Sequence, residues 1–99
     1  MEDIKVFKLI NGEELISKAT ENGSGWTLDS PAQIVMQQTK DGVGVALAPY
    51  MPYASGAITM YQHAVASKSK PDVKMENEYS RLFGSGIQIV SSTPASIIV

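Results

Sequence analysis

The sequence contains no cysteine, which excludes disulfides, iron–sulfur clusters, thiolate zinc sites and cysteine nucleophiles. Histidine occurs once, as His63, so a two-histidine metal site is excluded and a structural or solvent-facing role is the better interpretation. No apolar run reaches the roughly 18 residues of a membrane-spanning helix. The acidic start, Met1-Glu2-Asp3, lacks a signal-peptide pattern. These absences predict a cytoplasmic protein with no metal, no other cofactor and no membrane partner.

Positive charge is also scarce, because the formal net charge is −2. Most nucleic-acid-binding proteins are basic, since neutralising phosphates drives their affinity. Any nucleic-acid role must therefore depend on local geometry.

The 99 residues, 43% of them hydrophobic, predict a single domain over residues 1–99 with one modest core. A domain of this size gains stability by burying more surface in an oligomer.

Alternating apolar residues separated by turn signals predict a mostly β protein. The turn signals are Asn11-Gly12, Asn22-Gly23-Ser24-Gly25 and Asp41-Gly42, in which several residues tolerate positive φ. The first strand carries apolar residues on both faces, as a small closed barrel requires. The predicted strands cover residues 4–10, 13–21, 26–39, 43–49 and 57–68, which place His63 within the last strand.

A change from period two to helical spacing follows the last strand. Pro71 and Asp72 suit the start of a helix, and Gly84 suits its end. The sequence therefore predicts a helix over residues 71–83 and a C-terminal tail over residues 84–99, in which residues 87–90 can add an edge strand. Five strongly bent strands followed by a helix predict a small antiparallel barrel of the SH3-like or OB-like kind.

No group of residues has the pattern of a catalytic site. Glu13 and Glu14 alternate across a strand and point to opposite faces, so they do not form an acid–base pair. The Gly-x-Gly pairs do not open a βαβ helix, so they do not predict a phosphate site. The protein is therefore predicted not to be an enzyme.

Three aromatic residues have alternative interpretations. Trp26 follows a glycine-rich turn and is better explained as a core residue than as a stacking platform. Tyr50 and Tyr53 lie in a loop stiffened by two prolines. They can pack in an interface or stack on nucleic-acid bases, and the sequence leaves both open.

The segment Lys8-Leu9-Ile10-Asn11-Gly12-Glu13-Glu14-Leu15-Ile16-Ser17 resembles the first motif of the Sm/LSm family. There a strand runs into Asn-Gly and then into acidic, aliphatic and small residues. Trp26-Thr27-Leu28 falls where that family usually has Met-Asn-Leu. The layout, including the loop Tyr50-Met51-Pro52-Tyr53, is similar to that of Sm-like proteins encoded by phages of aquatic bacteria.

The chain departs from the family pattern at the base-binding loops. Sm-like proteins usually begin with a helix, whereas this chain is predicted to begin with a strand. Gly23, Gly25 and Thr27 replace the family's Asp, aromatic and Asn residues, and the loop Pro52–Gly56 has no basic residue. Only the positions of the loops, and not the residues of a uridine pocket, carry over.

The resemblance implies an SH3-like/Sm-like open barrel that pairs its fourth and fifth strand edges with other copies. A cyclic homo-oligomer of roughly five to seven subunits is expected. The expected subunit contacts are Val43, Val45, Leu47, Ile58 and Met60. The resemblance also implies binding of RNA or single-stranded DNA in nucleic-acid processing. The expected contact residues are Asn22, Ser24, Thr27, Tyr50 and Tyr53. The alternative is a structural or protein–protein interaction module, such as a phage accessory or assembly protein, that does not bind nucleic acid.

Overall fold

The computed structural model describes residues 3–84, and these form one antiparallel sheet of six strands with a helix after it. The strands are β1 (Asp3–Leu9), β2 (Glu14–Asn22), β3 (Gly25–Thr39), β4 (Gly42–Pro49), β5 (Ile58–Tyr61) and β6 (Val65–Ser69). The helices are the 3₁₀ helix η1 (Gln62–Ala64), α1 (Val73–Tyr79) and the π-helical turn η2 (Ser80–Gly84). The predicted mostly β fold is confirmed. The edge strand predicted at residues 87–90 lies outside the described residues.

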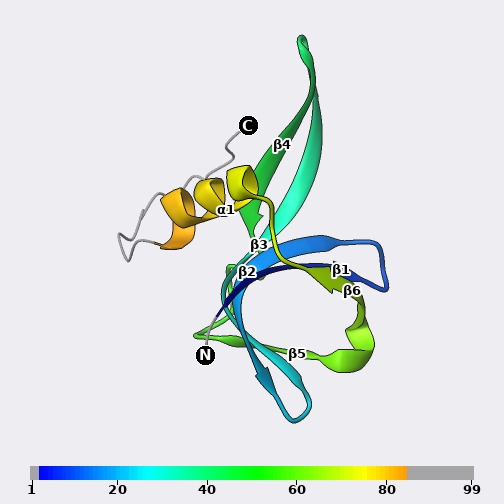
Figure 1. Ribbon diagram of the computed structural model, residues 1–99, viewed down its shortest axis with the longest axis vertical. Coiled ribbons are helices and arrows are strands. Elements are labelled where there is room, and N and C mark those ends of the chain that lie inside the picture. The colour runs from blue at the N-terminus through cyan, green and yellow to red at the C-terminus, as the bar shows by residue number, and fades with distance from the viewer. Residues whose placement is uncertain (1–2, 85–99) are drawn as a thin grey trace.

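The long strand β3 pairs with β2 and also with two further strands, β5 and β4. Its residues 25–28 pair with β5, and its residues 32–39 pair with β4. The sheet order is β4-β3-β2-β1-β6, and β5 pairs with β3 outside that path. Figure 1 shows the result: the strands around β5 and β6 curl into a barrel-like body, whereas β4 and the second half of β3 extend from it as a two-stranded ribbon.

The single strand predicted over residues 57–68 is instead two strands, β5 and β6, separated by η1. The reason is that the chain must cross from β3, the partner of β5, to β1, the partner of β6. Two backbone hydrogen bonds hold η1 at the crossing: Gln62 N donates to Ser24 O at 3.0 Å, and Ile10 N donates to Ala64 O at 2.9 Å. His63 therefore lies in a 3₁₀ helix and not within a strand.

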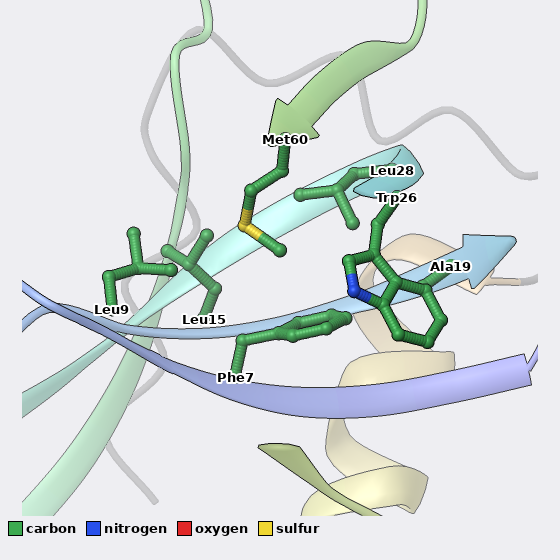
Figure 2. Packing of buried hydrophobic residues seen from close by; sticks show 7 residues of the cluster. All are labelled: Phe7, Leu9, Leu15, Ala19, Trp26, Leu28 and Met60. Atoms are coloured by element: carbon green, nitrogen blue, oxygen red, sulfur yellow. The ribbon is translucent and has the colours of Figure 1, made fainter. Parts of the chain in front are cut away.

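The interior of the barrel-like body is filled by apolar side chains from β1, β2, β3 and β5. Figure 2 shows these side chains pointing toward one another; they are Phe7, Leu9, Leu15, Ala19, Trp26, Leu28 and Met60. The rings of Phe7 and Trp26 meet edge to face, with centroids 5.3 Å apart. Such aromatic contacts add to the stabilisation from burial alone. The predicted core position of Trp26 is confirmed.

A second apolar cluster lies between the sheet and the helical segment. Ile16, Ala32 and Leu47 pack there with the helical residues Tyr79 and Leu82. The strand β1 supplies both clusters, because Phe7 and Leu9 belong to the first and Ile4 and Val6 pack against the second. The two-sided apolar pattern of the first strand is thus confirmed, and its cause is that β1 runs between the barrel interior and the helix.

The helix α1 begins at Val73, two residues later than predicted. Asp72 is the N-cap in an extended conformation, and its Oδ1 accepts a hydrogen bond from Met75 N at 2.7 Å. A side chain in this role satisfies one of the free N–H groups in the first turn. Among the helices within residues 3–84, none has the length and apolar character needed to cross a membrane.

Candidate nucleic-acid interface

The turn between β2 and β3 is organised by the side chain of Asn22. Its Oδ1 accepts a hydrogen bond from Ser24 N at 2.8 Å, and its Nδ2 donates to Thr27 Oγ1 at 3.0 Å. Asn22 and Ser24 are exposed and Thr27 is half-buried. The structure therefore brings these three predicted contact residues together, and it holds them by hydrogen bonds within the turn.

The 3₁₀ helix η1 lies directly against this turn, because Gln62 N donates to Ser24 O at 3.0 Å. Tyr61 pairs with Gly25 in the β3–β5 ladder. The rings of Tyr61 and His63 stack, with centroids 6.1 Å apart and planes at 14°. Tyr61 is 55% exposed, so a flat aromatic surface stands beside the polar turn.

Sequence reasoning missed Tyr61 and His63 as members of this surface. The prediction of one continuous strand over residues 57–68 places Tyr61 and His63 on one face of that strand. It gives no indication that they lie beside the turn of Asn22. The signal was the pair of ring-bearing residues on both sides of Gln62. Tyr61 is the last residue of β5 and His63 lies in η1, and their rings stack across this change of backbone.

Tyr50 and Tyr53 lie in a different part of the molecule. Tyr50 N donates to Pro31 O at 2.9 Å, whereas the Asn22 turn meets β3 at Gly25. Most of the β3–β5 ladder therefore separates the two loops, and the structure does not gather the predicted contact residues into one site. Tyr53 is 84% exposed, whereas Tyr50 is half-buried and packs against the barrel core.

Tyr50 is fixed by its hydroxyl as well as by its backbone. The hydroxyl donates to Glu13 Oε1 at 3.3 Å. Burial raises the pKa of the phenol, and the negative charge of Glu13 and the hydrogen bond to it act in the same direction. Tyr50 is thus held as a neutral side chain against the barrel and is less free to stack on a ligand than Tyr61.

Basic side chains near the barrel are balanced by acidic ones. A surface hollow of about 370 Å³ is bordered by both Lys5 and Lys68 and by both Asp3 and Glu21. Lys68 Nζ lies 5.5 Å from the centroid of the Trp26 ring, a cation–π distance. This hollow has no excess of positive charge for a phosphate.

The five predicted interface residues divide into exposed and buried ones. Val43 is 66% exposed near the tip of the ribbon, and Val45 and Ile58 are half-buried. Leu47 and Met60 are buried in the two apolar clusters of the chain's own core. Side-chain contact with another subunit is therefore open to the first three, whereas Leu47 and Met60 stabilise the fold.

The acidic and histidine side chains are dispersed over the described part of the chain. Among residues 3–84, no group of three or more histidine, aspartate or glutamate side chains lies close enough to hold a metal ion. His63 has an aromatic neighbour, Tyr61, at stacking distance.

The sequence was compared with protein-family models and with curated proteins. No protein-family model matches the sequence, and no curated protein matches it either. The Sm-like resemblance of the first half of the chain therefore stays a prediction, and the function must be argued from the turn, from η1 and from the sheet edges.

Proposed function

We propose that this protein is a non-enzymatic, Sm-like module that binds single-stranded nucleic acid, RNA or DNA, and that assembles with copies of itself into a ring. The observation that carries the binding proposal is the stack of Tyr61 and His63 beside the turn of Asn22 and Ser24. An exposed aromatic face can take a base by stacking, since every base has a flat π face. The neighbouring amide and hydroxyl groups can bond to base edges or to the 2′-hydroxyl of RNA.

The acidic net charge limits the affinity of a single copy of this site for nucleic acid. Binding that depends on stacking has a weaker salt dependence than binding through many phosphate contacts. A ring that repeats the site once per subunit gains affinity through multivalency without basic residues. Assembly thus supports binding, and the two parts of the proposal belong together.

Self-assembly is supported by the edges of the sheet. Within residues 3–84, β4 pairs only with β3, and β6 pairs only with β1. Each therefore has a second edge whose backbone groups are available to another strand, and natural proteins usually cover or blunt such edges. Pairing of β4 in one copy with β6 in the next is a head-to-tail contact, which produces a ring when the rotation closes.

The binding proposal is tested by fluorescence anisotropy with labelled oligo-U RNA and oligo-dT DNA at low salt. The variant Tyr61→Ala removes the stacking surface and leaves the backbone pairing of β5 possible. Loss of one stacked base costs about 1–3 kcal/mol, so we expect affinity to fall roughly tenfold to a hundredfold.

The matched control is Tyr53→Ala, because Tyr53 is the most exposed tyrosine of the other loop. We expect this variant to bind like the unmodified protein. Absence of binding by the unmodified protein at low salt rejects the proposal. An equal loss in both variants shows instead that the loop of Tyr50 and Tyr53 takes part.

A second candidate is a protein–protein interaction module without nucleic-acid binding. The observation that favours it is the apolar face of the ribbon, where Met36 pairs in register with Val45 and Gln38 with Val43. Met36 and Val43 are both largely exposed, and exposed apolar groups of this kind mark contact surfaces when they cluster. Purified protein whose absorbance ratio shows no nucleic acid, and which binds none when it is added, favours this candidate.

A further inference from the structure

A cavity of about 490 Å³ lies where the β4 and β5 ladders of β3 separate. The β5 ladder ends at Leu28 and the β4 ladder begins at Ala32. Between them, residues 29–31 of β3 face the loop of residues 50–57, and Phe83 closes one side. We name this hollow the interladder cavity. Its volume falls within the range typical of ligand pockets.

The interladder cavity is lined by polar groups, among them Asp29 and Ser30, and by several rigid rings. The rings belong to Pro31, Pro49 and Pro52 and to the aromatic residues Tyr50 and Phe83. Proline fixes its own φ, so the walls change little when a ligand enters. The backbone hydrogen bond from Tyr50 N to Pro31 O joins the loop to β3, and Phe83 stacks on Tyr79 with ring centroids 5.4 Å apart.

Two residues on these walls have strained backbones. Ser30 has φ +57° and Met51 has φ +53°, and both line the cavity. A non-glycine residue in this region costs of order 1–3 kcal/mol, and such residues concentrate at ligand sites. They are the only non-glycine residues with positive φ in the described chain, and one cavity holds both of them.

The single charged residue of the cavity indicates what kind of ligand it can bind. Asp29 is the only charged residue among those that line it, and its Oδ1 accepts a hydrogen bond from Ser30 Oγ at 3.2 Å. The carboxylate is exposed to solvent, and the cavity walls supply no basic group to pair with it. A cation that also has a flat apolar face is complementary to this combination of one carboxylate, two aromatic rings and three proline rings.

The guanidinium group of arginine has these properties, because it pairs with a carboxylate in its plane and stacks on aromatic rings through its faces. The ammonium group of lysine is a strongly hydrated point charge and lacks the flat face. An arginine side chain fills only part of the volume, so an apolar neighbour in the same ligand is needed for the proline-lined remainder. We propose that the interladder cavity binds a segment of a partner protein in which an arginine, held by Asp29, adjoins an apolar residue.

This site is separate from the proposed nucleic-acid surface. The interladder cavity meets β3 at residues 29–31, whereas the Asn22 turn and η1 lie at the Gly25 end of the β3–β5 ladder. Either proposal can therefore fail without the other, and one protein sample can be tested for both.

The test is a titration of the ¹⁵N-labelled full chain with the capped dipeptide N-acetyl-Arg-Leu-amide, followed by NMR. We expect the backbone amide signals of the lining residues to move together. These signals belong to Ser30, Met51, Ala54, Gly56 and Ala57. The matched probe replaces arginine by citrulline, which keeps the shape and removes the charge. An ion pair with an exposed carboxylate contributes up to about 1 kcal/mol, so we expect the citrulline peptide to bind roughly fivefold more weakly.

Two variants test whether Asp29 causes the preference for the arginine peptide. Asp29→Asn retains the backbone carbonyl of residue 29, and we expect it to bind both dipeptides equally weakly. Asp41→Asn makes the same change in net charge at the tip of the ribbon, and we expect it to bind like the unmodified protein. The proposal is overturned if the arginine peptide moves no lining signals up to its solubility limit, or if it moves signals elsewhere. Equal affinity for the citrulline peptide, or an equal loss in Asp41→Asn, also overturns it.

Discussion

The hydroxyl of Tyr79 donates to the carbonyl oxygen of Ser30 at 2.8 Å, although the two residues belong to the helix and to the bend of β3. Ser30 has φ +57°, and it lies where β3 leaves one ladder for the other. The same hydroxyl lies 3.1 Å from Asp29 O and accepts a hydrogen bond from Lys18 N at 3.1 Å. One side chain of α1 thus binds the bent parts of two strands, which couples the helix to the shape of the barrel.

The variant Tyr79→Phe removes these hydrogen bonds and keeps the ring in the second apolar cluster. Because it removes hydrogen bonds to part-buried backbone groups, we expect the free energy of unfolding to fall by roughly 1–3 kcal/mol. Urea denaturation measures this change, and an unchanged slope shows that the fold itself is kept. Tyr53→Phe removes a hydroxyl from an exposed ring and is the control. If Tyr79→Phe lowers the free energy of unfolding no more than Tyr53→Phe does, the Tyr79 hydroxyl does not couple the helix to the barrel.

Gly25 is expected to tolerate no side chain, whereas Gly23 two residues earlier is expected to tolerate one. A Cβ on Gly25 would press on Met60 O, and it would lie 2.7 Å from Gln62 N. These are backbone atoms and cannot move aside without breaking the β3–β5 ladder. A Cβ on Gly23 meets nothing within 4 Å.

We therefore expect Gly25→Ala to lower the midpoint of thermal unfolding strongly and Gly23→Ala to leave it nearly unchanged. Loss of the β3–β5 contact in Gly25→Ala is also expected to shift the NMR signals of η1. Similar unfolding midpoints for the two variants would show that the close approach of β5 to Gly25 does not exist in solution.

Much of the fold follows from local signals in the sequence. The turns at Gly12 and Gly42 adopt the positive φ that the Asn-Gly and Asp-Gly pairs predict, and β4 matches the prediction within one residue. The division of residues 57–68 into β5, η1 and β6 was not predictable in this way. It results from closure between β3 and β1, and contacts between distant segments leave no local pattern in the sequence.

The candidate sites also combine local features, which the sequence predicts, with contacts between distant segments, which it does not. The hydrogen bonds among Asn22, Ser24 and Thr27 are local, and the sequence predicted that these residues act together. The position of η1 beside them depends on the Gln62–Ser24 hydrogen bond, which spans distant parts of the chain. The interladder cavity depends on the pairing of β3 with both β4 and β5, and no property of Asp29 or Met51 in the sequence indicates it.

The environment of Tyr50 predicts a dependence of stability on pH. Its pKa is raised above 10.0, first by burial and then by Glu13, so the neutral phenol is favoured in the folded protein. The stabilisation is complete below about pH 10, the unfolded value. It is lost as the pH rises through the higher pKa of the folded state. Tyr50→Phe has no phenol to ionise, so we expect its stability to fall less over this alkaline range.

The titration itself is measured as the difference in tyrosinate absorbance between the unmodified protein and Tyr50→Phe. We expect the midpoint of this difference to lie above 10, and Glu13→Gln to move it downward. Glu14→Gln is the matched control, since Glu14 forms its ion pair with Lys8 at 3.7 Å and does not contact the phenol. A midpoint that Glu13→Gln leaves in place contradicts the role assigned to Glu13.

Assembly through the edge of β4 is expected to respond to charge near the tip of the ribbon. Light scattering of the unmodified protein should give the mass of several subunits, and Val43→Lys should lower it, because a lysine on an edge strand opposes pairing with another strand. Val73→Lys places the same charge on α1, where the valine is 74% exposed, and should leave the mass unchanged. A monomeric unmodified protein contradicts the ring. An oligomer that persists in Val43→Lys shows that copies join through a surface other than the edge of β4.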